Sequence, residues 1–207
     1  MRAALRAGAA VYNDGHYHAA HDAWAERWLE LESGTHDELL LHGLIQFTAA
    51  VHHAHERNWE GTVGLAESAG EYLEGLPETY RTVDLAAVRA YLEELATDPE
   101  VIERRDPIDL RVGEDAPGLA DLGLEEGVIA AGVLAEELGL APEPIELAGE
   151  FALADLEDGR DDSQFIPLVR DFILRDDHRG LVHERLTAHV ERRRAIEEDV
   201  GGLFEGE

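Results

Sequence analysis

The sequence predicts an all-α protein, built as an antiparallel helical bundle around a central helix hairpin, with a C-terminal group of about four helices. Three observations support this prediction. Apolar residues recur at the spacing of a buried helix face in one segment after another. Capping residues and short turns rich in glycine or proline separate these segments. Of all the segments, residues 108–112 alone alternate in the manner of a strand.

Residues 17–32 and 36–57 form the predicted central hairpin. The first helix places six residues on one stripe: Tyr17, Ala20, His21, Trp24, Trp28 and Leu31. Gly34 suits a left-handed C-cap because it has no Cβ. Thr35 suits the next N-cap, with Glu38 at the capping-box spacing. A turn this short makes the two helices antiparallel neighbours.

The short turn also predicts which residues lie level across the hairpin. Counted outward from the turn, Trp24 lies level with Gly43, and His21 lies level with Gln46. A glycine inside a helix costs about 1 kcal/mol relative to alanine, so it usually has a structural reason. We expect that the missing side chain of Gly43 makes room for the indole of Trp24.

The remaining helices follow in order along the chain. In residues 1–98 they are a short helix over 2–12, a helix over 59–74 and a helix that Asp84 caps and that ends at Asp98. This N-terminal bundle is followed by a linker rich in proline and glycine, 99–123, whose extended piece is either a plain linker or an edge clasp. A C-terminal helical extension, 124–207, has helices over 124–139, 144–157, from 163 onward, and 179–199.

The charge is the strongest global signal. The chain has 46 acidic and 17 basic residues, a net charge of −29 at pH 7, and every basic residue is an arginine. A carboxylate-rich surface without lysine resembles proteins of extreme halophiles, because molar salt shortens the Debye length to about 3 Å and screens the self-repulsion. An acidic chain from an ordinary bacterium is the alternative. We expect no nucleic-acid partner, because no basic patch is present to meet phosphates.

The sequence also bounds the environment of the protein. It has no cysteine, so disulfides and thiolate chemistry are excluded. No apolar run approaches the roughly 20 residues of a membrane span, and the N-terminus lacks the apolar core of a signal peptide. We therefore expect a cytoplasmic protein without a membrane partner.

One region is a candidate site. Eight of the eleven histidines lie between residues 16 and 61. The candidate binding pocket consists of His21, Asp22, Gln46 and His52. Because His52 falls about 10 Å along the helix axis from Gln46, we expect two loose clusters and no single compact one. A divalent metal would need three or four converging ligands. The structural alternative is a buried His21 that hydrogen bonds to Gln46.

Other marked residues have simpler structural explanations. Trp24 and Trp28 are expected in the core. Asn58 and Gly61 are expected to form a cap and turn at the start of the helix that follows the hairpin. No phosphate-binding loop, dinucleotide-binding glycine motif or His-Glu-x-x-His helix is present in the sequence.

Several of these residues together resemble a known family. The resemblance rests on Ala20-His21-Asp22, Trp28, Gly43-Leu44-Ile45-Gln46, His52, Asn58 and Gly61, within about residues 8–75. They are similar to a family of small all-helical proteins that is catalogued as domain of unknown function number three hundred and nine. The family pattern has glutamate where this chain has Asp22 and Ala25, with Glu26 beside the latter. The resemblance implies a helical bundle and no established activity.

Two functions remain open on these grounds. The first is a non-catalytic helical binding or scaffold protein of a halophilic cytoplasm, whose partner, a second copy or another protein, stays unspecified. The second is a metal-dependent enzyme, in the first place a hydrolase, that uses the region of His21, Asp22 and Gln46 with a divalent metal as cofactor.

Overall fold

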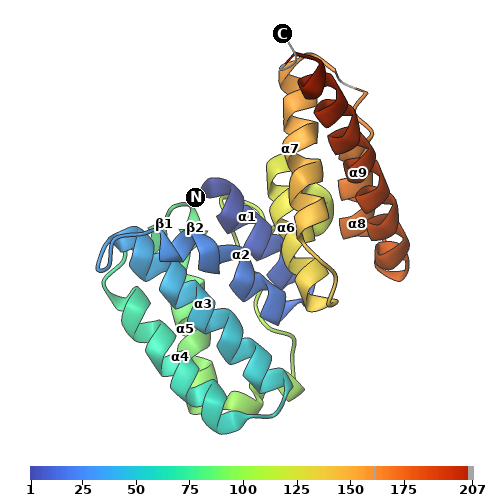
Figure 1. Ribbon diagram of the computed structural model, residues 1–207. Coiled ribbons are helices and arrows are strands. Elements are labelled where there is room, and N and C mark those ends of the chain that lie inside the picture. The colour runs from blue at the N-terminus through green and yellow to red at the C-terminus, as the bar shows by residue number, and fades with distance from the viewer. Residues whose placement is uncertain (161, 205–207) are drawn as a thin grey trace. The chain divides into compact units, whose positions relative to one another are not determined.

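The computed structural model describes residues 1–160 and 162–204, and it confirms the all-α prediction. Contacts divide the chain into two compact units, one spanning Met1–Leu122 and a second that begins at Gly123. Figure 1 shows both units as groups of helices. Residues 205–207 of the predicted C-terminal extension lie outside the described residues. The three-segment division predicted from the sequence stays a prediction.

Five helices form the first unit. They are α1 (Arg2–Asn13), α2 (Tyr17–Leu29), α3 (His36–His55), α4 (Trp59–Glu74) and α5 (Leu85–Thr97). Successive helices pack side by side, and α3 contacts both α2 and α4 most extensively. The central position of α3 explains why it is buried on more than one side, as its wide apolar arc predicts.

The central hairpin forms, but α2 ends at Leu29 with Glu30 as its C-cap, so Gly34 lies within the turn and does not cap the helix as predicted. Gly34 has a φ of +80°, a left-handed conformation that glycine adopts without a Cβ penalty. The Thr35 hydroxyl accepts a hydrogen bond from the Glu38 N–H at 3.3 Å and so caps α3. The carboxylate of Glu38 accepts from the Gly34 N–H at 3.1 Å. In a standard capping box this carboxylate would accept from the N–H of the N-cap residue, Thr35. Here Glu38 bonds instead to the residue before the N-cap and so closes the turn.

The predicted fit between Gly43 and Trp24 is wrong. A Cβ on Gly43 would lie 2.5 Å from the Cγ of Leu73 in α4, so the missing side chain makes room for α4. Trp24 packs instead against Gly8 of α1, where a Cβ would lie 2.3 Å from the indole. The error arose because the register across the α2–α3 hairpin says nothing about which third helix covers each face.

Residues 99–122 belong to the first unit by their contacts. They contain two short 3₁₀ helices, η1 (Pro99–Glu103) and η2 (Leu119–Asp121). Val112 forms an isolated antiparallel bridge with Val83, next to the strand pair β1 (Thr79–Tyr80) and β2 (Val83–Asp84), which the sequence did not predict. This bridge agrees with the clasp alternative for the extended piece, because that piece pairs with β2, directly before the start of α5.

Four helices form the described part of the second unit. They are α6 (Leu124–Glu137), α7 (Glu143–Glu157), α8 (Phe165–Leu174) and α9 (Arg179–Phe204), with the 3₁₀ turn η3 (Asp176–His178) before α9. Helix α7 contacts α6, α8 and α9. The C-terminal group of about four helices is thus confirmed.

Candidate functional site

Four histidines form a row along the α2–α3 hairpin, and we call His21, His18, His52 and His53 the histidine row. The ring centroids of His18 and His21 lie 6.2 Å apart, those of His18 and His52 5.3 Å, and those of His52 and His53 6.1 Å. We expected two separate clusters, but His18 contacts a ring of each. The helix spacing alone concealed this link, because the side chain of His18 spans the gap.

The four residues of the predicted pocket do not all converge. The Nδ1 of His21 lies 2.7 Å from Oδ1 of its neighbour Asp22, so the imidazole bonds within α2. His52 belongs to the histidine row, and its Nε2 lies 3.7 Å from a carboxylate oxygen of Glu56. Gln46 lies half-buried on α3, and no hydrogen bond joins it to His21 within the described residues. The structural alternative for His21 is therefore replaced by the contact with Asp22.

The histidine row does not form a metal centre within the part of the chain that the structure describes. No group of three or more His, Asp or Glu side chains there has the arrangement to hold a metal ion. The row is partly exposed, with 62 % of the His18 side chain and 38 % of the His21 side chain accessible. It is an open surface of imidazoles beside two carboxylates, those of Asp22 and Glu56.

A buried carboxylate, Glu38, joins the two helices near their turn. Its Oε1 accepts from the indole Nε1 of Trp28 at 2.8 Å and lies 3.3 Å from Nδ1 of His42. The His42 ring stacks on Tyr72 of α4 at 3.8 Å. Burial opposes ionisation of Glu38, but the hydrogen bonds from Trp28, Gly34 and His42 outweigh it and lower its pKa.

Sequence reasoning identified Glu38 for capping and missed this larger role. The i, i+4 spacing of Glu38 and His42 was a usable signal, because it predicts neighbours on one helix face. The signal was incomplete without Trp28, which comes from the other helix. Trp28 is half-buried, and its indole N–H donates to Glu38. Trp24 is fully buried, and its indole N–H donates to the Ala4 carbonyl at 2.9 Å.

Asn58 and Gly61 serve as a cap at the start of α4. The Asn58 Oδ1 accepts from the Gly61 N–H at 3.1 Å, and its Nδ2 lies 2.6 Å from Nδ1 of His53. A Cβ on Gly61 would lie 2.6 Å from Asn58 Nδ2 and 2.8 Å from His53 Nδ1, so only glycine fits there without displacing these side chains. This contact fixes His53 at the end of the histidine row.

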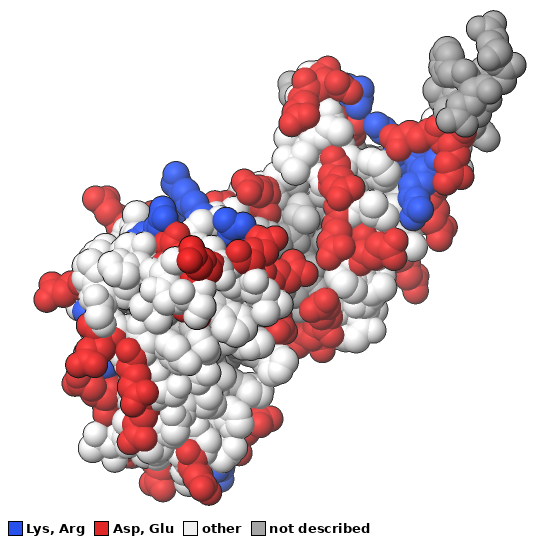
Figure 2. All heavy atoms as spheres, turned by 60° about the vertical axis from the view of Figure 1, so that its left-hand side comes forward, with Lys and Arg blue, Asp and Glu red and all other residues white. Residues whose placement is uncertain are grey.

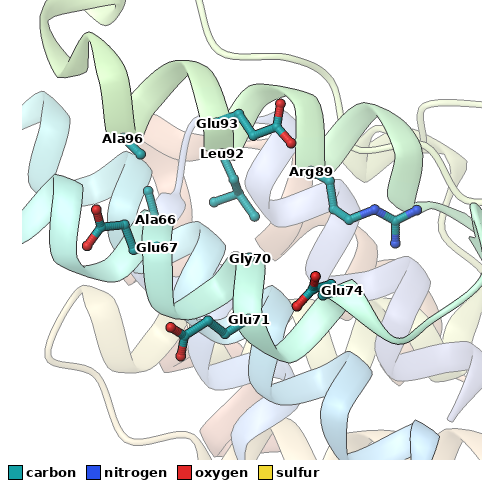
Figure 3. A pocket seen from close by; sticks show the side chains of 9 residues that line it. All are labelled: Ala66, Glu67, Gly70, Glu71, Glu74, Arg89, Leu92, Glu93 and Ala96. Atoms are coloured by element: carbon teal, nitrogen blue, oxygen red, sulfur yellow. The ribbon is translucent and has the colours of Figure 1, made fainter.

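A groove between α4 and α5 was not predicted. It encloses about 340 Å³ and has a floor of small or apolar residues, Ala66, Gly70, Leu92 and Ala96, with a rim of Glu67, Glu71, Glu74 and Glu93 (Figure 3). Arg89 also lines it, and its guanidinium donates to the Leu73 and Leu76 carbonyls at the C-terminal end of α4. Three of the rim glutamates recur at helical spacing on α4, but only the packing of α5 makes a groove of them.

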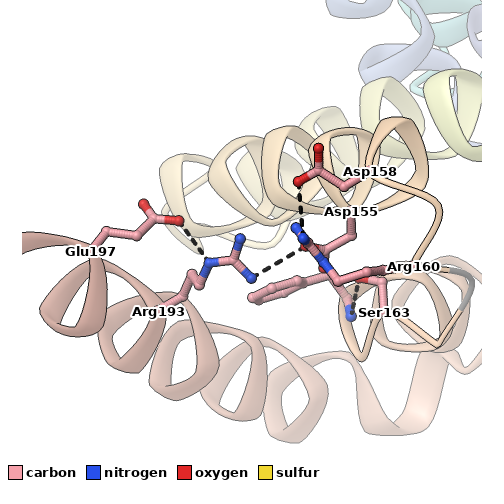
Figure 4. Close-up of polar contacts among 7 residues, drawn as sticks. Asp155, Asp158, Arg160, Ser163, Arg193 and Glu197 are labelled. Carbon is pink, nitrogen blue, oxygen red and sulfur yellow. Dashed lines mark hydrogen bonds and ion pairs between the residues drawn. The ribbon is translucent and has the colours of Figure 1, made fainter. Parts of the chain in front are cut away.

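The second unit contains its own buried carboxylate, shown in Figure 4. Asp155 of α7 accepts from Arg160 at 2.6 Å and from Arg193 of α9 at 3.2 Å. Arg193 also donates to Glu197 at 2.6 Å on the same helix. Burial raises the pKa of Asp155. Hydrogen bonds from Arg160 and Ser163 and the charge of Arg193 lower it by more than burial raises it, so the pKa lies below its ordinary value.

Part of the first unit matches a known family model. Residues 5–65 match the model of a family described as a domain of unknown function, DUF309. The predicted resemblance is thereby confirmed for this segment. The DUF309 segment begins in α1, contains the whole α2–α3 hairpin and ends in the first half of α4.

Two further findings stand beside the DUF309 match. A search of curated proteins finds no match to the chain. Within the described residues, no helix is both long and apolar enough to cross a membrane. The residues that line the α4–α5 groove and the whole second unit lie outside the matched segment.

Proposed function

We propose that the protein is a non-catalytic helical binding module of a halophilic cytoplasm. The observation that supports it most directly is how the tryptophans, two glycines and Asn58 of the DUF309-matched segment are used. Trp24 bonds to the Ala4 carbonyl, Trp28 bonds to Glu38, and Asn58 caps α4. Gly43 and Gly61 permit close packing. These residues build and align the hairpin, and the histidine row is what the hairpin presents to a partner.

The surface chemistry supports the halophilic part of the proposal. On the face shown in Figure 2, Asp and Glu side chains are spread widely, whereas Arg side chains gather in a few places. Several arginines of the chain are paired with acidic side chains, as Arg81 is with Asp37 at 2.7 Å. A net charge of −29 then stays largely uncompensated on the surface, a state that molar salt tolerates better than dilute buffer.

The alternative is a metal-dependent hydrolase that uses the region of His21, Asp22 and Gln46. One observation favours it: His18 and His21 both lie near the Asp22 carboxylate, at 3.8 Å and 2.7 Å. Imidazole with a neighbouring carboxylate is a common arrangement around catalytic metals. Gln46 contributes no contact to this group within the described residues, which is why the binding module is preferred.

Metal analysis of protein purified without a histidine tag separates the two functions. A binding module is expected to contain no stoichiometric zinc, manganese or iron and to melt at the same temperature with and without chelator. The enzyme requires a stoichiometric metal that is lost in His21→Ala and kept in the control His178→Ala, which changes an exposed histidine of the second unit. That result would overturn the proposal.

A further inference from the structure

The α4–α5 groove leaves an apolar channel open between two helices of the first unit. It encloses about 340 Å³, and its floor consists of small or apolar residues, with Leu92 of α5 pointing toward α4 (Figure 3). Gly70 belongs to this floor and lies inside α4, and a Cβ there would meet no atom within 4 Å. A helix placed in the groove can therefore approach the backbone of α4 closely at Gly70.

The rim of the groove is negative on both sides. Four exposed glutamates form it, three from α4 and one from α5: Glu67, Glu71, Glu74 and Glu93. Within the described residues, no arginine or histidine pairs with any of these four carboxylates. Other carboxylates of the first unit are paired, as Asp37 is with Arg81 and Glu103 is with Arg57. The rim therefore carries negative charge that the chain itself does not compensate.

Arg89 lines the groove but does not neutralise this rim. Its guanidinium Nη1 donates to the carbonyl oxygens of Leu73 at 3.1 Å and Leu76 at 3.2 Å, at the C-terminal end of α4. Along α4 the rim charges also repel one another, because Glu67 and Glu71 are four residues apart and like charges at that spacing destabilise a helix. Cationic groups of a partner, placed beside these carboxylates, would relieve the repulsion.

We propose that the α4–α5 groove binds an amphipathic helix of another protein, with aliphatic side chains on the floor and arginine or lysine side chains along both sides of the rim. Amphipathic helices dock in apolar grooves through anchors at positions i, i+3 or i+4, and i+7. A volume of about 340 Å³ corresponds to about eleven water molecules at 30 Å³ each, which is room for about two or three leucine side chains. The proposal goes beyond the binding module described above, because the groove is separate from the histidine row and its residues lie outside the DUF309 segment.

Charge selects this partner over other occupants of an apolar groove. A second copy of the chain has 46 acidic residues against 17 basic ones, so it would mostly set carboxylates against the rim, and like charges in contact oppose binding. Nucleic acid and anionic membrane surfaces are opposed for the same reason. An uncharged apolar molecule would use the floor and leave the rim uncompensated. A cationic amphipathic helix matches both the floor and the rim.

Calorimetric titration with a designed peptide tests the proposal. The probe is a helical peptide of 16 residues, the length of α4, with leucines on one face and arginines on both flanks. One control peptide replaces the leucines with serine, and the other replaces the arginines with glutamate. Titrations use the full chain in about 2 M KCl, where a Debye length of a few ångström screens the distant acidic surface and leaves only charges in contact. We expect saturable binding of one leucine–arginine peptide per chain and affinities lower by about tenfold or more for both controls.

Two glycine variants test whether the peptide binds in the groove. Gly70→Leu fills the groove, whereas Gly64→Leu places the same side chain on the same helix outside the groove lining. Both variants should keep the fold, as circular dichroism will show, because neither new Cβ meets an atom within 4 Å. Gly70→Leu should weaken peptide binding about tenfold or more, and Gly64→Leu should change it by less than about twofold.

Two charge variants test the rim. Glu67→Gln combined with Glu71→Gln should weaken peptide binding about threefold or more, because exposed ion pairs are individually weak. Glu146→Gln combined with Glu150→Gln makes the same change at the same spacing on exposed residues of α7, and it should leave the affinity within about twofold.

Five results would each overturn the proposal. They are absent saturation with the leucine–arginine peptide, equal binding of either control peptide, equal effects of the two glycine variants, equal effects of the two charge variants, and a dimer of the chain that Gly70→Leu dissociates. The last result would assign the groove to a second copy of the chain.

Discussion

Gly43→Leu, compared with Gly64→Leu, tests the packing of the hairpin most directly. Both glycines lie inside helices, so both variants gain about the same helix propensity, up to about 1 kcal/mol. They differ in what the new side chain meets. A Cβ at position 43 would lie 2.5 Å from Cγ and Cδ2 of Leu73, whose side chain is fully buried, whereas a Cβ at position 64 would meet nothing within 4 Å.

The expected magnitude follows from this contrast. Overpacking a well-filled core costs about 1–3 kcal/mol, and a leucine at position 43 should reach the upper part of that range because the Leu73 side chain that it meets is fully buried. For a unit of this size, 1 kcal/mol shifts the melting temperature by about 4 °C. Gly43→Leu is therefore expected to melt roughly 8–12 °C below Gly64→Leu.

Tryptophan fluorescence is the appropriate assay, because all three tryptophans lie in the first unit and report on its unfolding alone. Leu73→Ala in the Gly43→Leu background should recover part of the loss, with a coupling energy of about 0.5–3 kcal/mol. Equal melting temperatures for the two glycine variants, or the absence of coupling with Leu73, would refute the close contact between α3 and α4.

Four further predictions follow from the same structure. Gly8→Ala should push the indole of Trp24 aside and cost about 1–3 kcal/mol, whereas Gly132→Ala, with open space around it, should not destabilise α6; thermal melting compares them. Glu38→Gln should cost about 1–3 kcal/mol by denaturant titration, because one oxygen acceptor is lost beside three donors. Since the folded-state pKa of Glu38 is lowered, the stabilisation that its carboxylate gives is complete above the ordinary pKa of 4.5 and is lost as the pH falls through the folded-state pKa. In Glu38→Gln the free energy of unfolding should therefore fall less steeply with decreasing pH. An unchanged acid profile of stability would contradict this. Asp155→Asn should destabilise the second unit by about 1–3 kcal/mol, detected by circular dichroism, because Arg160 and Arg193 lose the negative charge of the carboxylate that accepts from both. The melting temperature should rise between about 0.1 M and 2 M KCl, and a flat or falling curve would contradict the halophilic assignment.

Much of the fold was accessible from local patterns. The starts of α3, α4 and α5 follow from residues that act on their own neighbours, the N-caps Thr35, Asn58 and Asp84. The end of α2 does not, because the helix stops at Leu29, before the predicted residue 32. The candidate site was less accessible. The sequence brought attention to His21 and His52, but the residue that links them is His18, and the pairing of His21 is with Asp22. Side-chain direction decided both points.

The sequence by itself determined the helices, the hairpin and the acidic composition, because helix periodicity, capping and charge are properties of residues a few positions apart. Only the tertiary structure decided that Gly43 faces Leu73, that Trp24 rests on Gly8, and that Asn13 holds a loop almost 100 residues away over Tyr12. Each of these contacts joins elements that no local pattern relates. Their partners are selected by the shape and buried area of the assembled core, which exist only once the helices have packed.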